Sequence, residues 1–378
     1  MAVTIGVIVA NLYYLQPLLH QVKGNFRIGT FAASVLITLV QFGYAMGLAF
    51  MVPLGDILRR RRLIVIIFLG AAVAMLAGSL VHNFVLFALL TVVIGLSSSG
   101  GHVIIPFAAD LADEGQRGRV VARLMTGLLL GVLLSRTFSG IVAEAVGWRG
   151  VYVIAALVLI ASALVLGRVL PSEPARRHVP YLELVGGSFG SLGTFRELRH
   201  RAWIGAAAFS AFSVLWSILA FHLSAAPFHY SNIEIGLFGL LGVGGVLAAN
   251  VAGRLADRHR SREATIVAAL LIAGSFVLMG VGHNNVWLLM VAIFLLDLGV
   301  QGIQITNQAI IFTLDPERRS RINSAYMVCY FSGGALGSLA AGFIYTHHGW
   351  TGMCLLGLAI GLITLVMTLL WRPAPSTN

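Results

Sequence analysis

Four polar side chains share one face of an otherwise apolar stretch of the chain. Asp297 lies in LLDLGVQGIQITNQ, and Gln301, Gln304 and Gln308 follow it at the spacing of an α-helix. Apolar surroundings cannot satisfy such a face, so it must contact water or another helix. Burial disfavours the charged form of a carboxyl group, which suits Asp297 to bind and release a proton. The alternative is a permanent hydrogen bond through which Asp297 joins two helices.

Three other apolar stretches carry polar candidates. His102, in GLSSSGGHVIIPF, has an imidazole that could relay a proton, although a structural hydrogen bond or a solute contact would also explain it. Asn11 and Tyr14, in NLYYLQPLL, are candidate solute contacts, as are Tyr326 and Tyr330 in YMVCYFSGG. The alternative for the tyrosine in the first stretch is an aromatic belt at a membrane interface.

Arg136 is a cation that directly follows LMTGLLLGVLLS and therefore lies inside an apolar helix. An ionisable side chain in such a place costs at least about 2–3 kcal/mol and indicates a function. Two interpretations remain open. The side chain either reaches to the membrane–water interface on the outer side of the bilayer, or it faces a cavity. In the cavity it would bind an acidic solute group or pair with Asp297 in one conformation.

The elements that must position these residues are predicted transmembrane helices. The 378-residue chain is 58% hydrophobic and 10% charged, which excludes an ordinary soluble domain. Apolar runs of about 20 residues, the length that a helix needs to cross a bilayer, recur from end to end. Twelve such runs predict an all-α membrane protein with twelve transmembrane helices.

The net charge of +11 is unevenly distributed along the chain. With the amino terminus in the cytoplasm, the basic residues fall in predicted cytoplasmic loops, except Lys23, Arg27, Arg136 and Arg149. Basic residues mark the cytoplasmic side of a membrane, so both termini are predicted to be cytoplasmic and no nucleic-acid partner is expected. The two cysteines and eleven histidines follow no metal-site pattern, and neither a metal nor a cofactor is expected.

The two halves of the chain repeat each other. LADEGQRGR at 111–119 matches TLDPERRSR at 313–321, an offset of 202, and the same offset superposes Gly147-Trp148 on Gly349-Trp350. The longest break between apolar runs separates the halves. We therefore predict two pseudo-symmetric six-helix bundles, at 1–167 and 202–378, joined by a cytoplasmic linker at 168–201.

A short charged loop also occurs in both halves, where MVPLGDILRRRRLI at 51–64 matches AGRLADRHRSREAT at 252–265. Through GRLADR, the second copy resembles the G-x-L-A-D-R loop of the major facilitator superfamily. The first copy departs from that pattern at Val52, Ile57 and Arg59. The resemblance covers the whole chain, and the NLYYLQPLL helix is similar to that of a group of bacterial permeases related to drug-proton antiporters and sugar-efflux permeases.

The resemblance implies that these loops close a gate on the cytoplasmic side through charge pairs. The residues at the matching positions are Asp56, Arg59, Arg60, Arg61, Gly253, Asp257 and Arg258. Asp56 could cap the helix that is expected to begin near Ile322. The alternative is that the arginines only set the topology and contact anionic lipid.

The resemblance also gives Arg136 a position in a family motif. Many antiport members carry G-x-x-x-G-P-x-x-G-G in the fifth helix, and the matching stretch here runs from Gly131 to Gly140. Arg136 replaces the proline of that motif, while Ser135 and Ser139 keep the small residues that allow close helix packing.

The implied protein is a secondary transporter of the bacterial cytoplasmic (inner) membrane whose partners are a small-molecule substrate, protons and the lipid bilayer. The resemblance favours proton-coupled efflux of a drug, sugar or metabolite by a monomer that works through alternating access. The alternatives are an importer or uniporter of a small solute, acidic or not, in which Asp297 binds the substrate, and a membrane protein without transport. An enzyme is disfavoured because no nucleophile elbow or phosphate-binding glycine loop is present.

Overall fold

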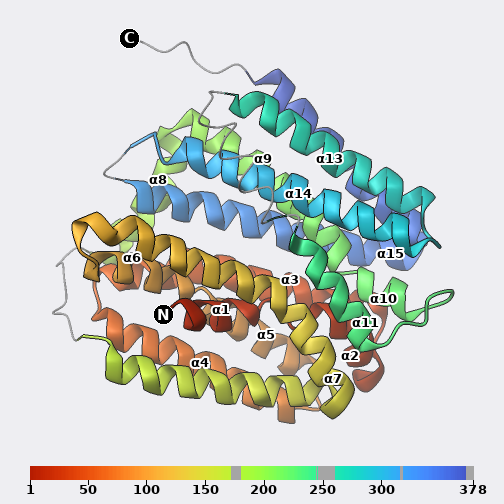
Figure 1. The fold of residues 1–378 in the computed structure, drawn as a ribbon, viewed down its shortest axis with the longest axis horizontal. Coiled ribbons are helices and arrows are strands. Elements are labelled where there is room, and N and C mark those ends of the chain that lie inside the picture. Colours follow the sequence, from red (N-terminus) through yellow and green to blue (C-terminus); the bar gives the residue numbers. More distant parts are fainter. Residues whose placement is uncertain (172–179, 244, 246–259, 316–317, 372–378) are drawn as a thin grey trace. The chain divides into compact units, whose positions relative to one another are not determined.

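The computed structural model describes residues 1–371 except 172–179, 244, 246–259 and 316–317 (Figure 1). Every regular element within these residues is helical, which confirms the predicted all-α fold. In chain order the elements are α1 (Ala2–Ala10), η1 (Gln16–Leu18), α2 (Leu19–Phe26), α3 (Thr30–Met46), η2 (Gly47–Met51), η3 (Val52–Asp56), α4 (Arg60–Leu80), α5 (Phe84–Ser98), α6 (Gly101–Leu111), η4 (Glu114–Gln116), α7 (Arg117–Val169), α8 (Tyr181–Thr194), α9 (Arg196–Trp216), α10 (Leu219–Ser224), α11 (Asn232–Leu237), η5 (Phe238–Gly242), α13 (Ser261–Val281), α14 (Val286–Ile311) and α15 (Arg319–Leu370).

The two longest elements each contain two of the predicted membrane-spanning helices. α7 has 53 residues and α15 has 52, and each holds one glycine with positive φ, Gly147 at 74° and Gly349 at 62°. Glycine tolerates positive φ because it has no Cβ, so the chain can reverse direction there. The two glycines are repeat partners. The turn that joins the fifth and sixth predicted helices is therefore repeated between the eleventh and twelfth.

The first predicted helix is broken in its middle. α1 ends at Ala10, residues 11–15 form turns, and the chain becomes helical again at Gln16. Within the break the amides of Leu12 and Tyr13 bond to carbonyls three residues earlier, at 3.1 and 3.0 Å. Such bonds are those of a tight 3₁₀ turn, and Pro17, which has no amide N–H, supports the irregular backbone that precedes it.

The seventh predicted helix is broken at the matching place. α9 ends at Trp216 and α10 begins at Leu219. The repeat offset of 202 superposes Tyr14 on Trp216, so the two breaks occupy equivalent positions. A third break separates α5 from α6, whereas α14, which holds Asp297, is continuous.

The chain forms two compact units. Unit 1 contains Met1–Gly186 and Ser217–Leu240, and unit 2 contains Gly187–Trp216 and Leu241–Asn378. The boundary after Trp216 coincides with the break in the seventh helix. The segment 217–240 therefore packs with the first half of the chain, and the Lys23 ammonium, for example, lies 5.8 Å from the centre of the Phe221 ring. The division into bundles at 1–167 and 202–378 stays a prediction.

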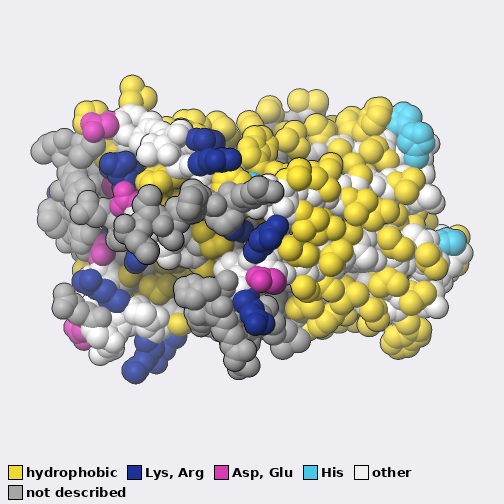
Figure 2. Space-filling view, turned by 90° about the horizontal axis from the view of Figure 1, so that it is seen from above, with side chains coloured by type: hydrophobic (Ala, Val, Ile, Leu, Met, Phe, Trp, Pro, Cys, Tyr) yellow, Lys and Arg dark blue, Asp and Glu magenta, His cyan; other side chains and the backbone are white. Residues whose placement is uncertain are grey.

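Side-chain types are segregated on the face drawn in Figure 2. Hydrophobic side chains cover one part of this face, on which His side chains are also visible, whereas Lys and Arg gather on the other part. Within the described residues, eight helical segments, some of them made of consecutive elements, are long and apolar enough to cross a bilayer. An apolar band next to a basic end is the pattern that the positive-inside rule predicts for a membrane protein.

Glycines bring α1 and α7 into backbone contact inside unit 1. A Cβ atom built on Gly6 would lie 2.6 Å from the carbonyl oxygen of Gly127, and one built on Gly131 would come even closer to the Cα atom of Gly6. No side chain fits at these distances. Close glycine contacts of this kind stabilise helix pairs in membranes through van der Waals packing.

Gly131→Ala is expected to lower the unfolding temperature of the detergent-purified protein, because the new methyl group forces α1 and α7 apart. The expected cost is about 1–3 kcal/mol. Gly118→Ala is the matched control on the same helix, since a Cβ there meets no atom within 4 Å. Equal melting curves for the two variants would contradict the proposed backbone contact.

Candidate functional site

Arg136 is buried against the break in the first helix. The side chain on α7 is 2% exposed, its Nε donates to Oε1 of Gln16 at 2.6 Å, and its guanidinium carbon lies 4.9 Å from the centre of the Tyr13 ring. The charged hydrogen bond and the cation–π contact together replace some of the hydration that the guanidinium loses. This burial contradicts the interpretation in which Arg136 reaches to the outer interface.

Two glycines allow α11 and η5 to approach Arg136 closely. A Cβ atom built on Gly236 would lie 2.7 Å from the carbonyl oxygen of Arg136, and one built on Gly239 would lie 2.7 Å from the Cβ atom of Arg136. The Thr137 hydroxyl also donates to the carbonyl of Gly236 at 3.0 Å. Because all of these residues belong to unit 1, the contact between α7 and the segment 217–240 lies within a single compact body.

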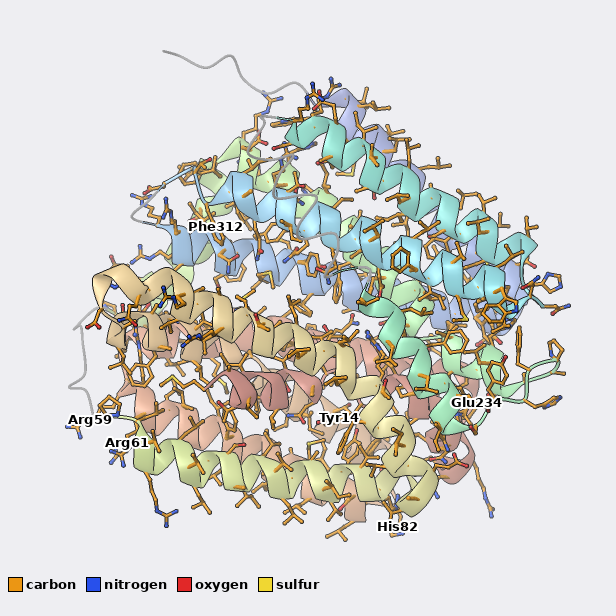
Figure 3. The ribbon with its side chains drawn as sticks, viewed as in Figure 1. Tyr14, Arg59, Arg61, His82, Glu234 and Phe312 are labelled. Carbon is orange, nitrogen blue, oxygen red and sulfur yellow. The ribbon has the colours of Figure 1, made fainter. Side chains whose placement is uncertain are left out.

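Glu144 fixes the beginning of α11 one turn beyond Gly140. Its Oε2 accepts hydrogen bonds from the backbone amide and the side-chain amide of Asn232, at 3.2 and 2.9 Å. Ser231 and Glu234 form a capping box on the same turn (Figure 3). We call the set Arg136, Gly140, Glu144, Asn232 and Gly236 the α7–α11 contact. Sequence reasoning missed Glu144, because nothing along the chain connects AEAVGW with YSNIEIG.

Asn11 and Tyr14 lie in the broken region of the first helix (Figure 3). Asn11 is 3% exposed, and neither polar atom of its amide has a hydrogen-bond partner among the residues that the structure describes. Tyr14 is 7% exposed, with its ring centre 5.8 Å from that of Phe138. This burial speaks against the aromatic-belt alternative for Tyr14, and its role as a solute contact stays a prediction.

His102 lies on the first turn of α6, just after the break in the fourth predicted helix. Its Nε2 is 3.0 Å from the hydroxyl oxygen of Tyr44, a residue of α3 that is 2% exposed. The sequence did not indicate this partner. The contact gives His102 a hydrogen bond within unit 1, and a role for it in proton transfer stays a prediction.

Unit 2 contains the polar stripe of α14, and its members have different surroundings. Asp297 is 3% exposed. Gln301 packs against Gly245, where an added Cβ would lie 2.6 Å from the Gln301 Cγ. Farther along the helix, the Gln308 side-chain amide donates to Oδ1 of Asn323 at 3.4 Å. The end of the stripe thus faces α15.

Tyr326 joins three elements of unit 2. Its hydroxyl donates to Oε1 of Gln304 at 2.8 Å and accepts from Nδ2 of Asn307 at 3.3 Å, and the same Asn307 nitrogen lies 3.1 Å from the carbonyl oxygen of Arg201. Gly205 on α9 makes room for it, because a Cβ there would lie 2.5 Å from the Tyr326 oxygen. We call Gln304, Asn307 and Tyr326 the Tyr326 cluster.

Tyr330 is the second predicted tyrosine of α15. It is 4% exposed and stacks on Phe209, with ring centres 4.3 Å apart and an angle of 19° between the rings. Sequence reasoning missed Asn307, although its position in ITNQ between Gln304 and Gln308 was a usable signal.

The candidate site residues of the two halves occur in separate units, and their candidate roles stay predictions.

At the predicted cytoplasmic end of unit 1, Arg60 is the centre of a charge cluster. It is 7% exposed, and its guanidinium lies 2.7 Å from Asp110 Oδ2, 3.0 Å from the carbonyl of Gly55 and 3.6 Å from Asp56. Asp110, at the end of α6, was missed by sequence reasoning. Gly253, Asp257 and Arg258, the expected gate residues of the second copy, lie outside the described residues.

The sequence matches a known protein family along its whole length. A family model described as Major Facilitator Superfamily covers residues 1–226 and 202–378, which together span the chain. The chain belongs to the major facilitator superfamily. The resemblance inferred from its charged loops is confirmed, together with the two-bundle, twelve-helix fold of this family of transporters.

Individual proteins that are similar to this chain are also transporters. The uncharacterized transporter YgaY of Escherichia coli O157:H7 is 42% identical over 372 residues, which cover 98% of this chain and 94% of the relative. The probable transporter SCO4007 of Streptomyces coelicolor is 30% identical over 354 residues, or 93% and 82% of the two chains. A solved bacterial homologue of the human lysosomal transporter Spinster, inward-facing and occupied, has a TM-score of 0.76 at 12% identity, covering 99% of this chain and 97% of its own. That likeness concerns the fold.

Tyr326→Phe tests whether the Tyr326 cluster stabilises this transporter. The substitution removes the hydroxyl and leaves Gln304 and Asn307 without it, so the expected loss is about 1–2 kcal/mol, measured as a lower unfolding temperature. Tyr345→Phe is the control, because Tyr345 lies far from the cluster along the same helix, and it should leave the unfolding temperature nearly unchanged. A Tyr326→Phe protein as stable as the Tyr345→Phe protein would contradict the assignment.

Glu144→Ala tests the attachment of α11. Losing both hydrogen bonds to Asn232 should raise the hydrogen-exchange rate of amides 232–237 roughly tenfold, because local opening becomes easier by about 1–2 kcal/mol. Exchange is followed by mass spectrometry of the transporter in nanodiscs. Glu263→Ala, an exposed substitution on α13, serves as the control. Unchanged exchange at α11 would show that Glu144 does not hold it.

Proposed function

We propose that this transporter exports a small organic solute in exchange for protons, by alternating access, in the cytoplasmic membrane of a bacterium with both termini in the cytoplasm. The observation that carries the proposal is the buried carboxyl group of Asp297, in the middle of the continuous helix α14. Efflux as the direction follows from the resemblance to drug-proton antiporters and sugar-efflux permeases.

The argument for proton coupling rests on the cost of a charge in an apolar helix. Among the described residues Asp297 is the acid with the lowest exposure, at 3%, and a charged carboxylate inside an apolar helix is expensive. A proton removes this cost. The carboxyl group should therefore be protonated while its surroundings are closed to water, and ionised when the cavity opens to a side of low proton concentration.

The argument for a solute site rests on the broken helices. Discontinuous helices in secondary transporters place polar groups near the middle of the membrane, where substrates bind. The breaks after Ala10 and Trp216 are equivalent in the repeat, and the first contains the buried residues Asn11 and Tyr14. We propose that Asn11, whose amide has no described partner, contacts the solute directly. The corresponding contacts proposed from the second half are Gln301, Gln304, Tyr326 and Tyr330.

The argument for gating rests on two sets of contacts in unit 1. The α7–α11 contact is held by glycine packing and by a few hydrogen bonds, which suits it to close and reopen. We propose it as the outer gate. We propose Asp56, Arg59, Arg60 and Arg61, together with Asp110, as the first half of the cytoplasmic gate.

A second candidate function is uptake or facilitated diffusion of a small acidic solute. The buried cation Arg136 favours it, since a guanidinium pairs well with a carboxylate or a phosphate. In that case Asp297 would bind the substrate, and no proton would move with it.

The test is transport into proteoliposomes with Asp297→Asn. A stability screen across antibiotics, sugars and amino acids first supplies a transported compound. We expect Asp297→Asn to abolish accumulation driven by a pH gradient while retaining solute counterflow, which needs no net proton movement. Asp113→Asn, an exposed change in a loop, is the control. Full proton-driven accumulation by Asp297→Asn would refute the coupling role, and transport without proton flux would favour the second candidate.

A further inference from the structure

The beginning of α4 and the end of α7 enclose a groove of about 360 Å³ in unit 1. It is lined by Arg59, Arg61, Arg62, Val65, Ile66 and Gly167. Figure 3 shows Arg59 and Arg61 close together at the first turn of α4. None of the lining residues belongs to the candidate solute site, and no acidic side chain is among them.

The cations of this groove have little compensation inside the protein. Arg61 donates to the carbonyl of Gly167, near the end of α7. The side chains of Arg59 and Arg62 form no ion pair or hydrogen bond within the described residues. All three stand at the amino-terminal end of a 21-residue helix, where the unpaired backbone amides already carry partial positive charge. The three guanidinium groups therefore repel one another and the positive helix end, and an anion in the groove would reduce this repulsion.

The groove also has an apolar layer, which lies a helical turn deeper than the arginines. Val65 follows Arg61 by four residues, and Ile66 follows Arg62 by four, so each apolar side chain lies on the same face as an arginine. Ile66 is 59% exposed. A charged layer beside an exposed apolar layer matches the boundary between the headgroups and the acyl chains of a bilayer.

The second half of the chain provides an internal comparison. There Arg262 donates to the carbonyl of Leu369 at 3.0 Å, which is the repeat equivalent of the contact between Arg61 and Gly167. However, Glu263 stands where the first half has Arg62, and Leu369 stands where it has Gly167. Relative to the second half, the first half therefore has an extra cation and lacks a bulky side chain at the same place. Both differences favour an anion in the groove.

We propose that this groove binds the headgroup of an anionic phospholipid, with the phosphate at Arg59 and Arg62 and an acyl chain along Val65 and Ile66. A soluble phosphate would satisfy the same guanidinium groups. The exposed Ile66 and the partly exposed Val65 below them favour the lipid, because a soluble anion gains nothing from such a surface.

Two variants test separately the contribution of the arginine charges and that of the open space beside Gly167 to lipid binding. Arg59→Gln with Arg62→Gln removes two cations and should weaken phosphatidylglycerol binding roughly thirtyfold. Gly167→Leu keeps every arginine but copies Leu369 into the groove, and it should weaken binding as well. The Gly167 position tolerates a side chain, since a Cβ there meets its nearest described atom, in Val65, at 3.5 Å. Arg119→Gln with Arg123→Gln is the control, with the same charge change on α7 outside the groove.

Binding is measured by native mass spectrometry and by the unfolding temperature in phosphatidylcholine nanodiscs that contain increasing fractions of phosphatidylglycerol. We expect phosphatidylglycerol to stabilise the wild type and the control, but hardly to stabilise the two groove variants, whose unfolding temperatures in pure phosphatidylcholine should equal that of the control. Equal lipid affinity in all variants would overturn the proposal. Stabilisation by inorganic phosphate as large as that by phosphatidylglycerol would overturn its assignment to a lipid.

Discussion

Hydrocarbon offers no hydrogen-bond partners, so every polar group inside the membrane must find its partner within the protein or in a water-filled cavity. This constraint explains why the described chain is helical almost throughout. It also makes the exceptions informative. The turns at 11–15 leave backbone and side-chain groups without helical partners, and they occur where Arg136 and Gln16 form a buried charged hydrogen bond. The segment 217–240 packs on the same place. One buried cation, one broken helix and one docked segment therefore meet within unit 1.

Much of the fold follows from features that are local in sequence. Apolar runs predict the helices, and the pairs Gly147-Trp148 and Gly349-Trp350, which lie at the repeat offset, mark the two sharp turns that the structure contains. The breaks are harder to predict. NLYYLQPLL suits a continuous helix up to Pro17, and the buried partner of its broken region, Arg136, is distant in sequence. The association of 217–240 with the first half is equally non-local, because the packing role of its glycines is evident only from their contact with α7.

Some residues of the candidate site could likewise be predicted from the sequence, and others could be recognised only in the structure. Asp297 and the glutamines of α14 were found because a polar residue in an apolar helix is conspicuous. Glu144 and Asp110 were missed because each is ordinary where it stands in the sequence and becomes important through one partner, namely Asn232 and Arg60. For Arg136, periodicity and composition left two positions open. Burial speaks against the interfacial position, since the side chain is 2% exposed, while a cavity-facing role stays a prediction.

The repeat conserves backbone features more closely than side chains. Equivalent breaks and equivalent glycine turns occur in both halves, yet His102 corresponds to Gln304, Arg136 to Ser338 and Arg62 to Glu263. A symmetric pair of bundles can rock between two states, but identical bundles would give both halves the same chemistry. Buried charges are costly, so one copy of each is easier to accommodate than two. The asymmetric positions are therefore where proton, solute and lipid chemistry can be assigned to one half, while the shared backbone supplies the movement.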